Sequence, residues 1–170
     1  MAIRINGCGS QSARVLRREA VAIVTGGSVG AGRAIARGLA SWNWAIVVVY
    51  LEHQHAAEAT VADILAAKGN IVAVRADLGD DLDVQRLFAE STAAFGGVDV
   101  VVHATTDSSS LLYEQAARNV RRQGAIVSVA PAEPVAPEVV RRLGERDIGV
   151  GTTAPEGVLA FLDMWRQHVC

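Results

Sequence analysis

One glycine-rich turn has the residue types and spacing needed to hold a phosphate group. The apolar run VAIV at 21–24 leads into TGGSVGAG at 25–32, and a helix-like stretch follows. A glycine turn between a strand and a helix leaves backbone amides unhindered and points the helix N-terminus at an anion. Gly26 permits the tight turn, Gly30 permits close approach to a pyrophosphate, and Gly32 permits tight helix–strand packing. This spacing predicts a dinucleotide-binding turn.

The elements that must position this turn alternate regularly along the chain. Most of the apolar runs are continuous in β-branched residues, as expected for strands covered on both faces. The predicted strands cover 20–25, 45–50, 71–75, 98–103, 125–130 and 148–152. The predicted helices cover 33–40, 56–68, 82–95, 111–122, 137–146 and a last segment beginning at Val158. This alternation predicts an α/β fold, a Rossmann-like doubly wound parallel sheet of about six strands.

Length and composition fit a single folded unit. The chain has 170 residues, half of them apolar, and we expect one Rossmann-like domain over 20–170 after a basic N-terminal arm over 1–19. The formal net charge of −2 gives no reason to expect a nucleic acid or an anionic membrane as partner. No apolar stretch approaches the roughly 18 residues of a membrane span. Two cysteines, Cys8 and Cys170, are simplest to explain in a reduced cytoplasmic setting.

The turn and several later segments resemble one family. TGGSVGAG matches the TGxxxGxG pattern of the short-chain dehydrogenase/reductase family, and residues 76–78, 98–102, 124–129 and 148–157 resemble its later segments in order. The resemblance covers about residues 20–157 and implies that the chain binds NAD or NADP. It assigns the cofactor contacts to Thr25, Gly26, Ser28, Gly30, Gly32, Tyr50, Asp77, Leu78, His103 and Ala104. Asp77 would contact the adenine end.

Two segments depart from the family around the cofactor. After the fourth strand the family has Asn-Asn-Ala-Gly, whereas this chain has His103-Ala104-Thr105-Thr106, so Thr106 adds bulk where a ribose would lie. At the end of the second strand, Tyr50-Leu51-Glu52 offers no Asp at the usual NAD position. No Arg stands at Val29 or Leu51 to meet a 2′-phosphate. The choice between NAD and NADP stays open.

The family's catalytic groups have no counterpart at the expected spacing. The reaction uses a Tyr as general acid/base, a Lys four residues later that lowers its pKa, and a Ser after the fifth strand. Gln54 lies four residues after Tyr50 and Ala117 lies four residues after Tyr113. Ala130 and Pro131 stand where the Ser is expected, and Lys68 is the chain's single lysine. We therefore assign no catalytic residue.

The carboxyl-terminal half is also shorter than the resemblance requires. Only 17 residues, Pro131 to Asp147, join the fifth and sixth predicted strands, which leaves room for one short helix. The resemblance implies a long helix here, and its shortening affects a surface through which family members dimerise. We therefore expect a fold truncated at its C-terminal end, without a seventh strand or a substrate lobe.

Other reactive residues give weaker signals. His53 and His55 lie two residues apart without a third ligand nearby, so we assign no metal. His103 at a strand end is more often a hydrogen-bonded, half-buried residue than a base. Residues 108–110, all serine, suit a helix cap better than a nucleophile.

Three functional hypotheses remain. The first is an NAD(P)-binding protein without reductase chemistry, serving as an accessory, regulatory or partner subunit and forming a homo-oligomer or a heteromer with a full-length relative. The second is an NAD(P)-dependent oxidoreductase with displaced catalytic groups such as Tyr113, His103 or Thr105. The third is a decayed fragment that retains no ligand.

Overall fold

The computed structural model describes residues 19–106, 110–129 and 135–168. The predicted basic arm over 1–19 lies outside this range except for Glu19. Ser108 and Ser109 of the predicted cap and Ala130-Pro131 also lie outside it.

Six strands form one parallel sheet in the described part of the chain. The strands are β1 (Val21–Thr25), β2 (Ala45–Tyr50), β3 (Asn70–Arg75), β4 (Val98–His103), β5 (Val120–Ser128) and β6 (Gly149–Thr152). Their spatial order is β3-β2-β1-β4-β5-β6, and every neighbouring pair is parallel. This confirms the predicted Rossmann-like sheet. The order reverses between β1 and β4, and the crevice at such a reversal is where ligands bind in open α/β sheets.

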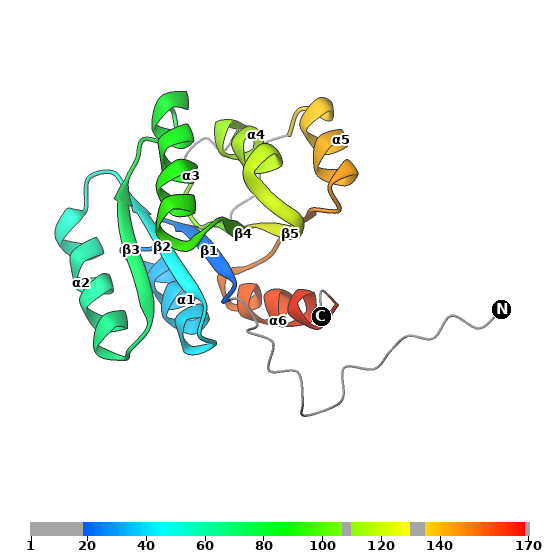
Figure 1. Cartoon of the computed structure of the whole chain (residues 1–170). Coiled ribbons are helices and arrows are strands. Elements are labelled where there is room, and N and C mark those ends of the chain that lie inside the picture. The colour runs from blue at the N-terminus through cyan, green and yellow to red at the C-terminus, as the bar shows by residue number, and fades with distance from the viewer. Residues whose placement is uncertain (1–18, 107–109, 130–134, 169–170) are drawn as a thin grey trace.

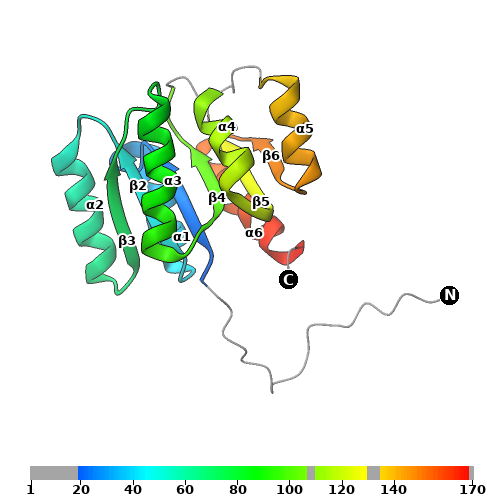
Figure 2. The ribbon, with the colours of Figure 1, turned by 45° about the horizontal axis from the view of Figure 1, so that its top comes forward.

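Helices cover both faces of the sheet (Figures 1 and 2). They are α1 (Gly30–Ser41), α2 (Gln54–Ala66), α3 (Asp81–Phe95), α4 (Ser110–Asn119), α5 (Pro137–Glu145) and α6 (Val158–His168), with a 3-10 turn η1 (Pro155–Gly157) before α6. Residues of α3, α4 and α5 share one hydrophobic core with the sheet, and residues of α1, α2 and α6 share the other. The sheet is therefore wound on both sides.

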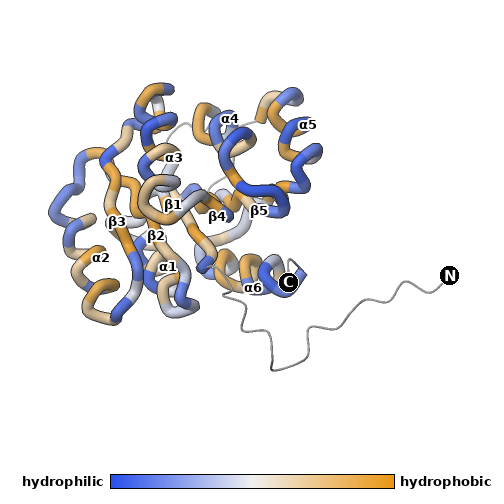
Figure 3. Tube along the Cα trace, viewed as in Figure 1, coloured by the Kyte–Doolittle hydropathy of each residue, from blue (hydrophilic) through white to orange (hydrophobic). Residues whose placement is uncertain are grey.

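Neighbouring residues of one strand enter opposite cores. Ile23 of β1 belongs to the core under α3 and α4, and Val24 belongs to the core over α1 and α2. Both are fully buried. Burial on both faces explains why β1, β2 and β4 read as continuous apolar runs rather than alternating ones. Figure 3 shows the same pattern, with hydrophobic strands inside and hydrophilic stretches on the outer helices.

Three tryptophans fasten the last helix to the start of β2. The rings of Trp42 and Trp44 lie 5.8 Å apart, and Trp165 of α6 lies 5.8 Å from Trp44, both pairs in edge-on contact. The Trp165 indole donates a hydrogen bond to the Gln123 carbonyl at 2.9 Å. These contacts hold α6 against the sheet.

The prediction of a helix over 111–122 is wrong at the carboxyl end of that helix. The helix ends at Asn119, and Val120 starts β5 by pairing with Val98. The Arg121 guanidinium binds the carboxylate of Asp99 at 3.0 Å, which holds this segment extended beside β4. These partners lie more than twenty residues earlier, so the local amphipathic pattern could not reveal them. No helix in the described ranges has the length and apolar character needed to cross a membrane.

Candidate dinucleotide site

A cavity of about 580 Å³ opens at the carboxyl ends of β1, β2 and β3. Its walls come from the glycine turn, the segments after β2 and β3, and one residue after β4. The lining residues are Thr25, Gly26, Ser28, Val29, Val49, Tyr50, Leu51, Glu52, His53, Ala76, Asp77, Leu78, Gly79 and Thr105. Its volume falls within the usual range for small-molecule sites. The cavity lies at the sheet edge where a dinucleotide is expected.

Three glycines give the turn its shape. Gly26 has φ of +63°, and a Cβ there would lie 2.6 Å from the Thr105 methyl group. Gly30 also has positive φ, +52°, but the space around it is open. A Cβ on Gly32 would overlap the backbone of Gly26. The turn therefore needs glycine at 26 and 30 for its backbone and at 32 for close packing.

Thr25 joins the ends of β1 and β4. Its Oγ1 lies 3.0 Å from Nδ1 of His103, its register partner, and accepts a hydrogen bond from the Ala104 amide at 3.1 Å. His103 is 2% exposed. These contacts fix the backbone that leads into Thr105. His103 is thus hydrogen-bonded, as its strand-end location suggested, but it is fully rather than half buried.

The loop after β3 is held by its own aspartates. Asp77 Oδ1 accepts a hydrogen bond from the Gly79 amide at 2.8 Å, and the Asp77 amide donates to Asp83 at 2.9 Å. Asp80 caps α3 by accepting a hydrogen bond from the Asp83 amide at 3.0 Å. Leu78 is buried between these turns. The loop therefore presents Asp77 and Gly79 to the cavity in a defined conformation.

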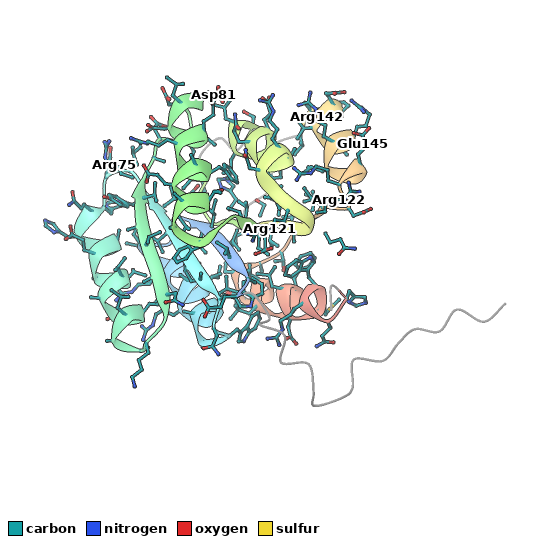
Figure 4. All side chains as sticks on the ribbon, viewed as in Figure 1. Arg75, Asp81, Arg121, Arg122, Arg142 and Glu145 are labelled. Carbon is teal, nitrogen blue, oxygen red and sulfur yellow. The ribbon has the colours of Figure 1, made fainter. Side chains whose placement is uncertain are left out.

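The cavity wall is acidic. Glu52 and Asp77 line it, and among the described residues no Lys or Arg does. Arg75 lies nearby at the end of β3, where its Nε donates to the Leu51 carbonyl at 3.1 Å. Figure 4 shows Arg121, Arg122 and Arg142 on the β5–α5 side, well away from Arg75. None of these three arginines lines the cavity.

Six of the ten predicted cofactor residues line the cavity, namely Thr25, Gly26, Ser28, Tyr50, Asp77 and Leu78. The other four, Gly30, Gly32, His103 and Ala104, are outside the lining, where Gly32 and His103 shape the turn from behind. Thr106, which we expected to add bulk near a ribose, does not line the cavity, whereas its neighbour Thr105 does. Val49, Ala76 and Gly79 were not anticipated. Val49 lies near the end of β2, and Ala76 and Gly79 follow the end of β3. These positions at strand ends could have pointed to the cavity.

The displaced catalytic groups considered from sequence lie in different places. Tyr113 is 1% exposed and belongs to the core under α4 rather than to the cavity wall. Burial raises the pKa of Tyr113 above its ordinary value, and Ser128 offsets part of that rise. The Tyr113 phenol is therefore not in contact with the cavity in the described part of the chain. Thr105 lines the cavity, and His103 lies behind it.

No metal-binding cluster occurs among the residues that the structure describes. Nδ1 of His55 lies 3.4 Å from Glu58 within the exposed first turns of α2. His53 lines the dinucleotide cavity instead.

Known proteins resemble this chain both in sequence and in fold. The family model for short chain dehydrogenases matches residues 20–123. An uncharacterized oxidoreductase of Methylorubrum extorquens is 40% identical over 97 residues, which cover 57% of this chain and 37% of that protein. A 3-oxoacyl-[acyl-carrier-protein] reductase of Synechocystis is 39% identical over 83 residues, covering 49% of this chain and 34% of the reductase. The matched segments thus span about a third of these curated relatives.

Solved structures agree over more of the chain. A short chain dehydrogenase from Burkholderia cenocepacia in complex with NADP superposes with a TM-score of 0.63 at 25% identity, covering 81% of this chain and 74% of that one. A blue fluorescent protein from a metagenomic library, in complex with NADPH, gives a TM-score of 0.64 at 21% identity, covering 79% and 73%. With a family model that matches more than half of its residues and a parallel sheet in the same arrangement, the chain belongs to the short-chain dehydrogenase/reductase family.

Proposed function

We propose that this chain binds a nicotinamide dinucleotide and acts as an accessory, regulatory or partner subunit rather than as a reductase of the usual family type. One observation carries the second half of the proposal. Lys68, the single lysine, is exposed just before β3. It therefore lies at the amino end of this strand, whereas the cavity opens at the carboxyl ends. No ammonium group is therefore available to lower the pKa of a tyrosine beside the ligand.

The residues at the cavity fit a dinucleotide. The amides of the glycine turn and the N-terminus of α1 would hold its pyrophosphate, because Gly26 and Gly30 leave the backbone unobstructed. The ends of β2 and β3, with Tyr50, Glu52 and Asp77, would hold the adenosine half. A bound nicotinamide supplies hydride-transfer chemistry. The chain's own residues bind and orient it.

The family relationship supports binding of NAD or NADP. The Burkholderia relative carries NADP, and the metagenomic protein carries NADPH. Two measurements on the purified chain test the proposal. Titration calorimetry with NAD⁺, NADP⁺, NADH and NADPH should give saturable binding to at least one. Absorbance at 340 nm with a panel of carbonyl substrates should give no steady oxidation of the reduced forms. Steady turnover would refute the accessory role, and absent binding would refute the site.

A second candidate is an oxidoreductase with displaced groups. It is favoured by the Thr105 side chain on the cavity wall and by His103 at the β1–β4 crevice. Under this hypothesis, oxidation of NADH or NADPH would be steady and would be lost on His103→Ala or Thr105→Val. If Tyr113→Phe alone abolished turnover, the buried position of Tyr113 would have to change during the reaction.

We also propose that the chain associates, with itself or with a full-length relative, in the cytoplasm. β6 is an edge strand whose Val150 is 50% exposed, and Met164 on α6 is also exposed. Exposed strand edges and apolar side chains favour pairing with another chain. Native mass spectrometry of protein from its own cell would report stoichiometry, retained nucleotide and partner together. A monodisperse monomer at micromolar concentration would refute association.

A further inference from the structure

The Thr105 hydroxyl is a buried polar group without a partner in the part of the chain that the structure describes. Its Oγ1 is shielded from solvent and makes no hydrogen bond. Buried side-chain hydroxyls in proteins are almost always hydrogen-bonded, so an exception needs an explanation. Thr105 also lines the cavity at the glycine turn. The residue that carries the unpaired group therefore borders the cavity, while Oγ1 itself is shielded from solvent.

The surrounding backbone holds Thr105 in place. The Ala104 amide donates to Thr25 Oγ1 at 3.1 Å, which ties the residue before Thr105 to the end of β1. The Thr105 methyl group packs against Gly26, where a Cβ would lie only 2.6 Å away. The side chain is thus fixed against the turn whose amides would meet the pyrophosphate.

We propose that the Thr105 hydroxyl donates a hydrogen bond to an oxygen of the bound dinucleotide, either a pyrophosphate oxygen or a ribose hydroxyl. The inference rests on the proposed dinucleotide binding. The short-chain dehydrogenase/reductase pattern Asn-Asn-Ala-Gly has alanine where this chain has Thr105. The hydroxyl contact is therefore an addition made by this chain. A hydroxyl that is already desolvated gains most from a charged acceptor, since it gives up no bond to water on binding.

Isosteric variants of the full chain test the proposal. Thr105→Val keeps the shape of the side chain and removes its donor, whereas Thr105→Ser keeps the donor and removes the methyl group. Thr106→Val is the matched control, because Thr106 is exposed and does not line the cavity. Titration calorimetry with NAD⁺ should show Kd about tenfold higher for Thr105→Val. Thr105→Ser and Thr106→Val should stay within about twofold of the unmodified chain.

Thermal unfolding without ligand separates binding from folding. The Tm of Thr105→Val should equal or exceed that of the unmodified chain, because the change removes an unpaired buried hydroxyl. If Thr105→Val fails to fold, Thr105→Ser and Thr105→Ala are compared instead. Only Thr105→Ala should then bind the dinucleotide more weakly than the unmodified chain. A binding loss shared by Thr105→Val and Thr105→Ser would assign the effect to packing and overturn the proposal.

ADP distinguishes the two acceptors. If Thr105→Val weakens ADP and NAD⁺ equally, the acceptor lies in the ADP half of the dinucleotide, on its diphosphate or its adenosine ribose. If only NAD⁺ is weakened, the acceptor lies in the nicotinamide ribose, and the proposal stands in either case. An unchanged Kd for both ligands overturns this inference alone. Absence of any dinucleotide binding by the unmodified chain overturns the proposed function with it.

Discussion

Thr25 and His103 are register partners on β1 and β4, and their side chains meet at 3.0 Å between Oγ1 and Nδ1. The two strands flank the point where the sheet order reverses. The same Thr25 oxygen accepts from the Ala104 amide, so one hydroxyl fixes the first residues after β4. A residue that begins the glycine turn therefore also shapes the opposite wall of the crevice.

Thr25→Val should destabilise the fold. The substitution keeps the side-chain shape but leaves the partly buried Ala104 amide without its acceptor, which costs about 1–3 kcal/mol. Urea unfolding followed by circular dichroism measures the free-energy change. Thr92→Val, on the exposed face of α3, is the control and should differ from the unmodified chain by less than about 0.5 kcal/mol. Equal stability of Thr25→Val and Thr92→Val would contradict the structural role.

The glycines of the turn should respond differently to alanine. At Gly30 the space is open, so Gly30→Ala should cost only the strain of positive φ, about 1–2 kcal/mol. At Gly32 the new methyl group would collide with the Gly26 backbone, so Gly32→Ala should cost more and should abolish dinucleotide binding. Gly144→Ala in α5, where space is open and φ is ordinary, should instead stabilise by about 0.5–1 kcal/mol. Denaturant titration ranks the three. A Gly32→Ala variant as stable as Gly30→Ala would contradict the close packing.

The acidic wall should favour the dinucleotide without a 2′-phosphate. Glu52 and Asp77 line the cavity, and no Lys or Arg in the described ranges does, so the unmodified chain should bind NAD⁺ more tightly than NADP⁺. Glu52→Gln removes one charge that repels the 2′-phosphate. The Kd for NADP⁺ divided by the Kd for NAD⁺ should therefore fall severalfold. Calorimetric titration gives both constants. Glu156→Gln, an exposed change in η1 outside the cavity, should leave the ratio unaltered. Tighter binding of NADP⁺ by the unmodified chain would oppose this assignment.

Tyr113 should make stability fall at alkaline pH. Burial raises its folded-state pKa, so the unfolded chain loses this proton first, above pH about 10. Stability from this group is therefore complete below pH about 10 and decreases as pH rises toward the folded pKa. Urea unfolding at pH 8 and pH 11 should show a smaller loss for Tyr113→Phe than for the unmodified chain. Tyr50→Phe, at the cavity, is the control. Identical losses for all three chains would show that Tyr113 ionises freely in the folded state.

The elements of the fold could be predicted from local sequence because burial on both sheet faces leaves a strong pattern. Continuous β-branched runs marked β1, β2 and β4. The end of α4 could not be predicted in this way. The helix ends before Val120 because Val120 pairs with Val98 of β4, and the Arg121 guanidinium binds the Asp99 carboxylate. Those contacts depend on tertiary structure.

The phosphate turn could be predicted because its chemistry is local, within a strand, a turn and a helix. The remaining walls depend on which strands become neighbours. Asp77 was recognised only through the family resemblance. Thr105 became a wall residue because β4 lies beside β1, which no spacing along the chain reveals. Tyr113 likewise could be placed in the core only once α4 was packed on the sheet.

All residues that line the cavity in the described part of the chain fall between Thr25 and Thr105. β5, β6 and the helices around them support this wall only from behind or from the side. Substitutions after α4 can therefore accumulate without changing a residue that lines the cavity, provided that β4 keeps its place beside β1. In this chain, the surface formed by β5, β6 and α5 can change while the lining of the cavity stays the same.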